Sequence, residues 1–420
     1  MSDECDITRP VQSCFPHEKD KRDMEVDKMK PRIIKEGVTW VGAVDWDRRL
    51  FDCLVPIPDG TSYNSYLVQG KDKTVLLDTV DPSMVGQLVD HLSDISTIDY
   101  VIAHHAEQDH SGSIPKILEM YPGAKVVCTP KCVEMLVDLL HVDRHRIISV
   151  EDGDMIDLGG RTLRFIHAPW VHWPETMFTY LEEDKILFTC DFLGSHLATS
   201  QLYSKNEPAE EAAAKRYFAE IMMPFGSMIV KNLDKISAYD IEIVAPSHGP
   251  IHDNPEFIIG RYKEWTSGPM KNEVCIAYVS MHGSTAAMVD ALVEELVERG
   301  VGVRRFELTG SDTGAIAMSL VDAATVVIAT PTVLAGAHPA AAYVAFLANA
   351  LRPRTRYLSV LTSYSWGGKA VEQIAGMTTN LRAEVLEPVI CKGLPREDDF
   401  AAIARLAELI AEKHREIGIL

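Results

Sequence analysis

Short apolar runs alternate with amphipathic segments from residue 38 onward. Runs rich in β-branched and aromatic residues predict strands, and apolar positions spaced three and four apart predict helices. In the first part of the chain, strands are predicted at residues 38–42, 62–68, 74–78, 98–103, 125–128, 161–166, 177–181, 185–190 and 241–245. Helices are predicted at residues 84–92, 114–120, 133–140 and 209–235. Two sheets flanked by helices account for this order.

Beyond residue 268 the pattern becomes a regular alternation of strands and helices. Strands are predicted at residues 274–279, 325–329, 357–361 and 385–391, and helices near 288–297 and 398–413. This alternation is typical of a doubly wound parallel sheet, here with five strand-helix units. We therefore predict a polar N-terminal extension at residues 1–33, a first domain at 34–268 and a second at 269–420.

Composition limits the possible partners and the compartment. The 420 residues carry a net charge of -20 and no long basic run, which disfavours nucleic acid and anionic membrane as partners. Eight cysteines are scattered without a paired CxxC pattern, which fits reduced thiols. No apolar signal region and no run of eighteen apolar residues occurs, so we expect a soluble cytoplasmic protein.

Residues 104–113 read HHAEQDHSGS and concentrate four metal-competent side chains, His105, Glu107, Asp109 and His110. They lie between a predicted strand and a predicted helix. Alternate positions of an extended loop point the same way, so three of them face one side while His110 lies across from them. Capping carboxylates and ordinary loop histidines are the alternative, but charges crowded this tightly need a compensating cation. The run therefore predicts a site for two metal ions.

Three more candidate ligands follow predicted strands: His172, Asp191 and His248. Strand ends hold a side chain rigidly while projecting it into a loop-lined cleft. Taken alone, each is equally well explained as a structural residue. Together with the first run they complete a set of seven.

Three loops of the second domain are candidates for binding a phosphorylated cofactor. Each follows a predicted strand, and the first opens a helix whose N-terminal amides can hold a phosphate without lysine or arginine. Capping alone could explain the first loop, and loop packing could explain its aromatic residues. The candidate residues are Ser280, Met281, His282, Gly283, Ser284, Thr285, Thr330, Pro331, Thr332, Gly336, Ser363, Tyr364, Ser365, Trp366, Gly367 and Gly368.

The first run resembles the HxExDH motif of the flavodiiron proteins, a branch of the metallo-β-lactamase superfamily. Most of that superfamily carries HxHxDH and binds zinc, whereas Glu107 replaces the middle histidine and favours iron. His172 lies 62 positions after His110 and Asp191 another 19 later, as in the family, and His248 follows 57 positions on. The three loops resemble the FMN loops of flavodoxins. The resemblance implies a metallo-β-lactamase-like αββα sandwich followed by a flavodoxin-like domain.

The resemblance also implies ligand roles. His105, Glu107 and His172 would bind one non-haem iron, Asp109, His110 and His248 the other, and Asp191 would bridge them. Some family members leave the residue equivalent to His110 unligated, so both roles stay open for it. His104 is predicted to support the site or the fold.

By the same resemblance, the protein reduces dioxygen to water, nitric oxide to nitrous oxide, or both. FMN would pass electrons to the diiron centre. No CxxC pair is present for a rubredoxin iron, so the donor is expected to be external: rubredoxin, a reduced deazaflavin or another flavoprotein. The family further implies a head-to-tail homodimer, or a tetramer, in which one subunit's flavin serves the other's irons.

Two other functions fit parts of the sequence. A zinc-dependent hydrolase of the metallo-β-lactamase fold with a regulatory flavodoxin-like domain is one, and Glu107 argues against it. The other is an electron carrier with a vestigial iron site, which the complete set of seven ligand positions disfavours.

Overall fold

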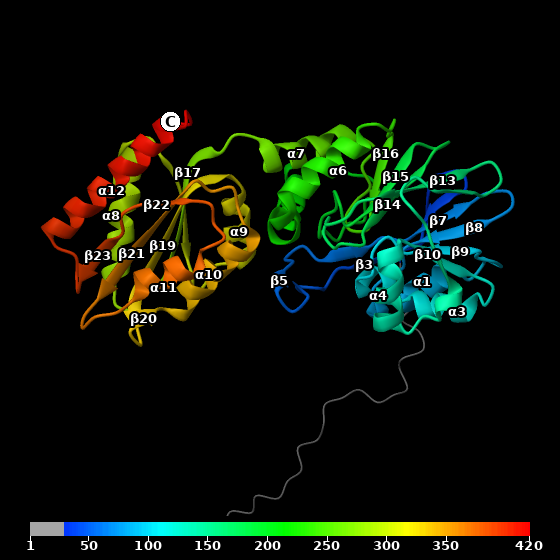
Figure 1. Cartoon of the computed structure of the whole chain (residues 1–420), viewed down its shortest axis with the longest axis horizontal. Helices are drawn as coiled ribbons and strands as arrows, with labels where there is room; N and C mark the ends of the chain where they lie inside the picture. The colour runs from blue at the N-terminus through cyan, green and yellow to red at the C-terminus, as the bar shows by residue number, and fades with distance from the viewer. Residues whose placement is uncertain (1–28) are drawn as a thin grey trace, which may run out of the picture.

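Residues 29–420 are described by the computed structural model, and they form two α/β lobes (Figure 1). The predicted boundary near residue 268 falls between α7 (Pro255–Ser267) and β17 (Lys271–Tyr278), where we propose to divide the domains. Most of the predicted N-terminal extension lies outside the described residues. Its last residues do not remain separate, because β1 (Arg32–Lys35) pairs with β2 (Val38–Trp40).

The N-terminal lobe contains two facing sheets. The first has the strand order β1-β2-β7-β8-β9-β10-β11, and its further strands are β7 (Tyr66–Gln69), β8 (Thr74–Leu77), β9 (Tyr100–Ile102), β10 (Lys125–Cys128) and β11 (Ile147–Ser149). The second runs β12 (Met155–Asp157), β13 (Thr162–His167), β14 (Met177–Leu181), β15 (Ile186–Cys190) and β16 (Ile243–Pro246). Apolar side chains of both sheets, such as Leu77 and Phe188, share one buried cluster between them.

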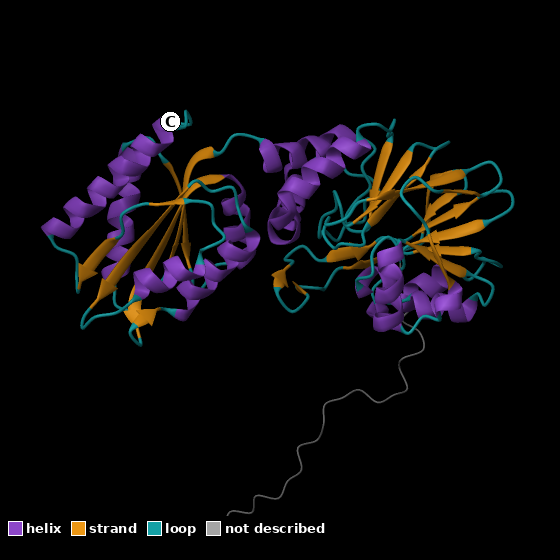
Figure 2. Ribbon diagram, viewed as in Figure 1, coloured by secondary structure: helices purple, strands orange, loops and turns teal. Residues whose placement is uncertain are grey.

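Helices cover the outer face of each sheet, which completes an αββα sandwich (Figure 2). The first sheet packs against α1 (Val85–His91), α3 (Ile114–Met120) and α4 (Pro130–Leu140). The second packs against α5 (Pro208–Tyr217), α6 (Gly226–Ile236) and α7. Two small hairpins lie apart from the sheets: β3 (Ala43–Asp45) with β6 (Thr61–Tyr63), and β4 (Leu50–Phe51) with β5 (Val55–Pro56).

The C-terminal lobe is a parallel sheet with the strand order 2-1-3-4-5. Its strands are β18 (Gly302–Glu307), β17, β19 (Ala323–Val333), β21 (Tyr357–Tyr364), and a fifth in two pieces, β22 (Glu384–Val385) and β23 (Val389–Lys392). One face is covered by α8 (Ser284–Glu298) and α12 (Glu397–Glu416). The other is covered by α9 (Thr313–Asp322), α10 (Pro339–Leu351) and α11 (Ala370–Met377). The predicted fold class is confirmed for both lobes.

Three predicted elements are interrupted. The strand predicted at 62–68 is divided, because the backbone N–H of Asn64 donates to the carbonyl of Ser247 in place of a ladder partner. The strand predicted at 385–391 breaks around Pro388, which has no N–H to donate. The helix predicted at 209–235 contains a π-helical segment at Phe218–Met222 and a 3-10 turn at Met223–Phe225 before α6 begins.

The two lobes also share buried apolar surface. Phe218 and Met222 of the π-helical segment belong to the same buried cluster as Ile316 and Leu320 of α9. Among residues 29–420, no helix is both long and apolar enough to cross a membrane.

Candidate metal centre and flavin site

The first four candidate ligands lie on the segment that follows β9. His105 and Glu107 are in the loop, whereas Asp109 and His110 belong to a short helix, α2 (Gln108–Ser111). The extended loop predicted for all four therefore stops at Glu107, whose carbonyl accepts hydrogen bonds from the N–H groups of His110 and Ser111. This helical turn brings Asp109 and His110 to one side of the site while His105 and Glu107 face the other.

The remaining three candidates come from the second sheet. His172 lies in the loop between β13 and β14, Asp191 directly follows β15, and His248 follows β16. All seven side chains meet between the two sheets, and they fall into two groups of possible ligands. One group is His105, Glu107, His172 and Asp191, and the other is Asp109, His110 and His248.

The Asp191 carboxylate faces both groups. Its Oδ2 lies 3.1 Å from Nε2 of His172 and 3.5 Å from Nε2 of His105. Its Oδ1 lies 2.9 Å from Nε2 of His110 and 3.3 Å from Nε2 of His248. Because each oxygen points at a different pair of imidazoles, one carboxylate is positioned to bridge two cations.

Several atoms of the cluster converge without forming ordinary hydrogen bonds. Neither oxygen of Asp109 nor Oδ1 of Asp191 has a well-directed donor among the described residues, although imidazole nitrogens lie 2.9 to 3.3 Å from Asp109 Oδ2 and Asp191 Oδ1. All three atoms are buried. Buried polar atoms that converge in this way fit a metal ion better than a hydrogen-bond network.

The buried carboxylates of the cluster also require positive charge nearby. Burial alone would lower the pKa of His172 and His248, but the carboxylates of Asp191, Glu107 and Asp109 outweigh it. The pKa of His172 rises to about 9 and that of His248 to about 10. The pKa of Asp191 falls well below its usual range despite burial, because of His110. Two cations would supply this charge while leaving the imidazoles neutral, as metal ligation requires.

Glu175 supports the cluster from behind, and sequence reasoning did not single it out. Its Oε1 lies 2.7 Å from Nδ1 of His105 and accepts the N–H of Ala106 at 3.0 Å. A carboxylate on the far ring nitrogen fixes the tautomer and orientation of a ligating histidine. His104 lies outside both groups, because its ring contacts Asp78 and Thr179 at 2.8 and 2.7 Å.

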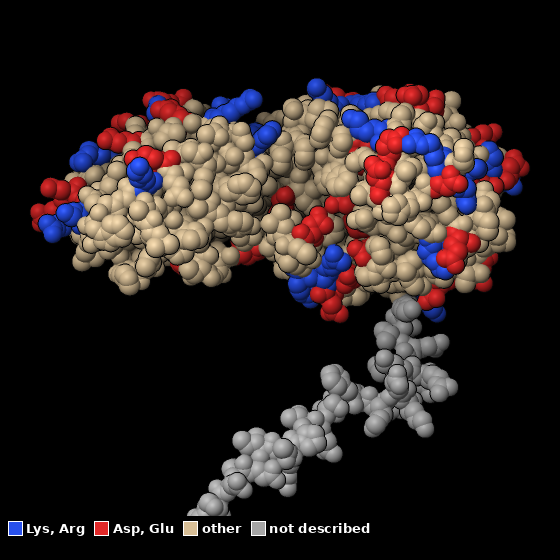
Figure 3. All heavy atoms as spheres, turned by 60° about the horizontal axis from the view of Figure 1, so that its bottom comes forward, with Lys and Arg blue, Asp and Glu red and all other residues tan. Residues whose placement is uncertain are grey.

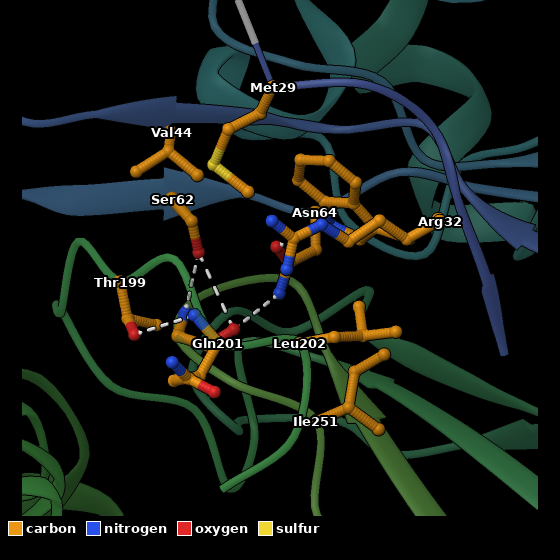
Figure 4. A pocket seen from close by; sticks show the side chains of 11 residues that line it. Met29, Arg32, Val44, Ser62, Asn64, Thr199, Gln201, Leu202 and Ile251 are labelled. Atoms are coloured by element: carbon orange, nitrogen blue, oxygen red, sulfur yellow. Dashed lines mark hydrogen bonds between the residues drawn. The ribbon is translucent and has the colours of Figure 1, made fainter.

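His248 is held by residues of β6. Its Nδ1 donates to the carbonyl of Ser62 at 2.6 Å, which leaves Nε2 facing Asp109 and Asp191. The next residue, Gly249, donates to Ser62 Oγ at 2.8 Å, and its carbonyl accepts from Asn64 Nδ2 at 2.8 Å (Figure 4). These contacts fix the loop after β16 on the side away from the cluster.

A small cavity of about 40 Å³ opens onto the cluster. Its lining adds side chains that the sequence did not point to, chiefly Asp52, His196 and Tyr217, together with the apolar Phe51, Val55 and Ile221. Burial, and then the charge of Glu107, raises the pKa of Asp52 to about 6. His196 lies five residues after Asp191, and this nearness to a candidate ligand is the one signal in the sequence that could have suggested it.

The flavin-loop candidates surround a second cavity of about 160 Å³ at the carboxyl ends of β17, β19 and β21. This is the edge of an open α/β sheet where ligands bind. The cavity is lined by Ser280, Met281, His282, Ser284, Thr285, Pro331, Thr332, Ser363, Tyr364, Ser365 and Gly393. Ten of these were predicted, and Gly393, which follows β23, was missed.

The other predicted residues lie around this cavity and do not line it. Thr330 is buried, and its hydroxyl accepts the N–H of His338. Gly336 belongs to β20 (Gly336–Ala337), a short hairpin with β19. Trp366 is 76% exposed, so most of its ring is uncovered in the single chain. Gly368 lies where a Cβ atom would be 2.3 Å from Thr332 Cγ2, so only glycine fits there. Gly283 and Gly367 adopt φ angles of 88° and 113°.

The cavity fits a phosphate group. Gly283 caps α8 without a side chain, and no acidic residue occupies the first turn of that helix. The helix N-terminus therefore offers free amides and a positive dipole end. Thr285 Oγ1 lies 2.9 Å from Ser363 Oγ, which joins the first and third loops.

Comparisons with known proteins agree with this architecture. Residues 61–249 match the family model described as ODP family beta lactamase, and residues 276–405 match the model described as flavodoxin. A nitric oxide reductase of Moorella thermoacetica is 35% identical over 398 residues, covering 91% of this chain and 99% of that protein.

Two solved structures are similar over nearly the whole chain. Rubredoxin oxygen:oxidoreductase of Desulfovibrio gigas has a TM-score of 0.89 at 28% identity, covering 92% of this chain and 99% of that one. The flavodiiron protein of Giardia intestinalis has a TM-score of 0.87 at 27% identity, covering 93% and 98%.

Proposed function

The chain belongs to the flavodiiron protein family, and from that premise we propose that it reduces nitric oxide, dioxygen or both, at two irons fed by FMN. The observation that carries this proposal is the Asp191 carboxylate, whose two oxygens face the two separate groups of candidate ligands. A bridging carboxylate holds two metal ions close enough to act on one diatomic molecule.

We assign His105, Glu107 and His172 to one iron, Asp109, His110 and His248 to the other, and Asp191 to both. The proximity of His110 Nε2 to Asp191 Oδ1, 2.9 Å, supports a ligand role for His110. Bound irons supply the electrons for reduction and a clamp for the substrate. The protein's own task is to orient these ligands, to admit a small molecule and to provide hydrogen-bond donors.

His196 is positioned to provide one such donor. Its Nδ1 lies 2.9 Å from Thr61 Oγ1, which is 3.3 Å from the Ser62 carbonyl. That carbonyl accepts both the Nδ1–H of His248 and the Thr61 hydroxyl, so the Thr61 contact does not by itself choose the tautomer of His196. Burial, and then the charge on His248, lowers the pKa of His196 and keeps it neutral. We propose that its proton is on Nε2, which has no partner in the described chain.

The other cavity residues control water and charge. Burial, and then the negative charge of Asp191, raises the pKa of the Tyr217 phenol well above its usual value, so it stays protonated beside the cluster. Phe51, Val55 and Ile221 form the apolar part of the lining. A cavity of about 40 Å³ admits a diatomic molecule and excludes larger substrates.

Electrons reach the irons through FMN, and they come from an external donor. The open N-terminus of α8 would hold the FMN phosphate, and Tyr364 and Trp366 would flank its ring. Rubredoxin is the donor named for the Desulfovibrio gigas relative, and we propose a small redox protein of that kind. The six cysteines among the described residues form no disulfide, which supports a location in the reducing cytoplasm.

We further propose a head-to-tail homodimer. The metal and flavin sites of one chain lie in different lobes (Figure 1). The face of the C-terminal lobe seen in Figure 3 carries few charged side chains. Leu334, Phe346 and Trp366 are 93%, 62% and 76% exposed on that domain. Exposed apolar side chains of this size mark an association surface.

Metal and flavin analysis of the anaerobically purified protein tests the proposed function. We expect two irons and one FMN per chain, and rapid consumption of nitric oxide or dioxygen once the flavin is reduced. The Asp191→Asn variant should lose paired iron while keeping FMN, because an amide offers one oxygen where two are needed. Loss of FMN with retained iron would contradict the assignment of the domains.

The same experiment distinguishes the proposed reductase from the alternative, a zinc-dependent hydrolase. Zinc occupancy with ester or thioester hydrolysis and no gas consumption would favour it, whereas zinc alone would not, since zinc displaces ferrous iron from shared ligands. The similar proteins named above are a nitric oxide reductase and an oxygen oxidoreductase, so the comparisons do not favour a hydrolase.

A further inference from the structure

A cavity of about 760 Å³ that nothing above uses lies between the two domains. One wall comes from the N-terminal domain: the turn at Met223–Phe225, the start of α6, and Thr266 of α7. The opposite wall comes from the α10–β21 and α11–β22 loops of the C-terminal domain. In Figure 1, α6 and α7 lie on the side of their domain that faces the second lobe. We call this cavity the interdomain cleft.

Four arginines line the interdomain cleft: Arg352, Arg354, Arg356 and Arg382. No aspartate or glutamate lines it, although the whole chain carries a net charge of -20. None of the four arginines forms an ion pair with another described residue. Two other exposed arginines of the same domain are paired, Arg304 with Glu273 and Arg415 with Glu408. The cleft therefore concentrates unneutralised positive charge in an acidic protein.

Arg354 is the deepest of the four. Its Nη1 donates to the carbonyl of Gly268 at 2.7 Å, and its Nε is buried without a partner. Burial, with Arg356 nearby, lowers the pKa of the Arg354 guanidinium. A buried N–H without an acceptor costs free energy that an anion in the cleft would recover.

The wall opposite the arginines is also free of negative charge. It includes Gly226 and Ser227 at the start of α6, which follows the 3-10 turn directly and has no acidic residue in its first turn. The Ser227 hydroxyl is a hydrogen-bond donor for an anion. Arginine recognises phosphate oxygens in bidentate geometry, which makes phosphate the best match for this lining.

We propose that the interdomain cleft binds a small phosphorylated anion with at least two phosphate groups, such as a nucleoside diphosphate. Its volume is that of a small-molecule site. Arginines on two loops, with Ser227 on the opposite wall, provide for more than one phosphate. Met223, Val230 and Met270 supply apolar surface for a ring, and Asn380 supplies an amide. The ligand would touch both domains and, through Arg354, the linker at Gly268.

Isothermal titration of the iron- and FMN-loaded protein tests this proposal, because bound FMN blocks the other phosphate site. The probes are inorganic phosphate, pyrophosphate and ADP. We expect saturable binding of pyrophosphate and ADP, with phosphate at least tenfold weaker. Binding should also raise the melting temperature, since it stabilises the folded state alone.

The variants are Arg352→Gln with Arg356→Gln, both exposed and unpaired, and the control is Arg405→Gln, an exposed arginine of α12 outside the cleft. The double variant should bind at least about tenfold more weakly, because a hydrogen bond to a charged group contributes that much or more. Arg405→Gln should bind as the original chain does.

Equal binding by the double variant and the control would overturn the proposal and indicate non-specific attraction. Phosphate as tight as pyrophosphate would also overturn it. Sedimentation of the same variants gives a third contrary outcome: a changed oligomeric state without any anion binding would make the cleft a contact between subunits. Iron and FMN contents are measured in each sample after titration.

Discussion

His196 presents an unpartnered ring nitrogen, Nε2, beside the metal cavity, and its neighbours hold the ring in place. Thr61 Oγ1 lies 2.9 Å from the opposite nitrogen, and the Tyr217 and His248 rings lie 4.9 and 4.8 Å from the His196 ring, centroid to centroid. This packing fixes the ring while its Nε2 keeps no partner. A preorganised hydrogen-bond donor in a site with little water contributes more binding free energy than the same donor does in solution.

Replacement of His196 by Phe should weaken binding of nitric oxide, or of azide as an anionic probe, by about tenfold, the effect of one lost hydrogen bond. His196→Gln, which keeps an N–H donor, should recover part of the loss. The measurement is a spectroscopic titration of the iron-loaded protein. Iron and FMN contents serve as the control, since the ring is not among the proposed ligands. Unchanged affinity in His196→Phe would show that Nε2 does not meet the bound molecule.

At the scale of elements, the π-helical segment Phe218–Met222 connects the metal cavity to the domain interface. Tyr217 and Ile221 line the cavity, while Glu220 turns toward α9. Arg216 lies 3.5 Å from Glu220 and 2.7 Å from Asp312, which caps α9. A π-helical turn changes the direction of neighbouring side chains within one helix. Because of this turn, the consecutive residues Glu220 and Ile221 face α9 and the metal cavity respectively.

Glu220 makes stability depend on pH. Burial raises its pKa to about 8 from the usual 4.5, even though Arg216 opposes the shift, and its Oε2 is buried without a partner. The folded state therefore holds this proton more tightly than the unfolded state does. The resulting stabilisation is complete below pH 4.5 and is lost as the pH rises toward about 8.

Glu220→Gln, which mimics the protonated side chain, should accordingly gain melting temperature over the original protein between pH 5 and pH 9. The measurement is thermal unfolding of the loaded protein at several pH values. Glu298→Gln, at an exposed residue of α8, is the matched control and should show no such trend. Parallel pH profiles for Glu220→Gln and the original chain would show that Glu220 is ionised in the fold.

The same region shows how much of the fold can be predicted from the sequence. Helical periodicity predicted residues 209–235 as one element, because apolar spacing hardly differs between α and π turns. Tertiary contacts with α9 decide where the helix widens, and a single sequence does not contain them. Pro388 lies inside the last predicted strand, and its missing N–H is a reason, visible in the sequence, for that strand to divide. The strand order 2-1-3-4-5 follows from the resemblance to flavodoxins, because alternating strands and helices alone also allow another doubly wound order.

For the site, residue type and spacing identified the seven side chains that the fold brings together. Four of them are close in sequence, and the resemblance supplied the other three. Glu175, His196 and Asp52 were missed because a lone polar residue near a motif gives no signal of its direction. Glu175 meets His105 from 70 positions away, through the packing of the β14 loop against the β9 loop. Only the folded chain shows that contact.

At the scale of the whole molecule, the separation of the two cofactor sites supports the proposed second subunit. Each chain carries its flavin loops at one edge of the C-terminal sheet and its metal ligands between the sheets of the other lobe. The face beside β20 and α10 carries few charged side chains. It adjoins the sheet edge that holds the flavin loops, because Leu334 lies two residues after Thr332 of the second flavin loop. A partner's metal domain that packs on this face would approach the flavin directly.

The double variant Leu334→Asp, Phe346→Asp should therefore convert the dimer to monomer. Each substitution would bury a charge at the centre of the interface, which costs at least about 2 kcal/mol and weakens association about thirtyfold or more. External reductant should still reduce the flavin, since its loops are intact. Gas consumption should fall in proportion to the monomer fraction and recover at high protein concentration. Sedimentation velocity and stopped-flow flavin reoxidation measure the two effects on one sample.

Val297→Asp is the matched control, because Val297 is an exposed apolar residue of α8, 57% accessible, on a helix covering the opposite face of the sheet from α10. It should leave both the oligomeric state and the reoxidation rate unchanged. A monomeric Leu334→Asp, Phe346→Asp variant with an undiminished reoxidation rate would mean that electrons pass between the two sites within one chain. The lobes would then have to close around the linker at residues 268–270, and the head-to-tail arrangement would be wrong.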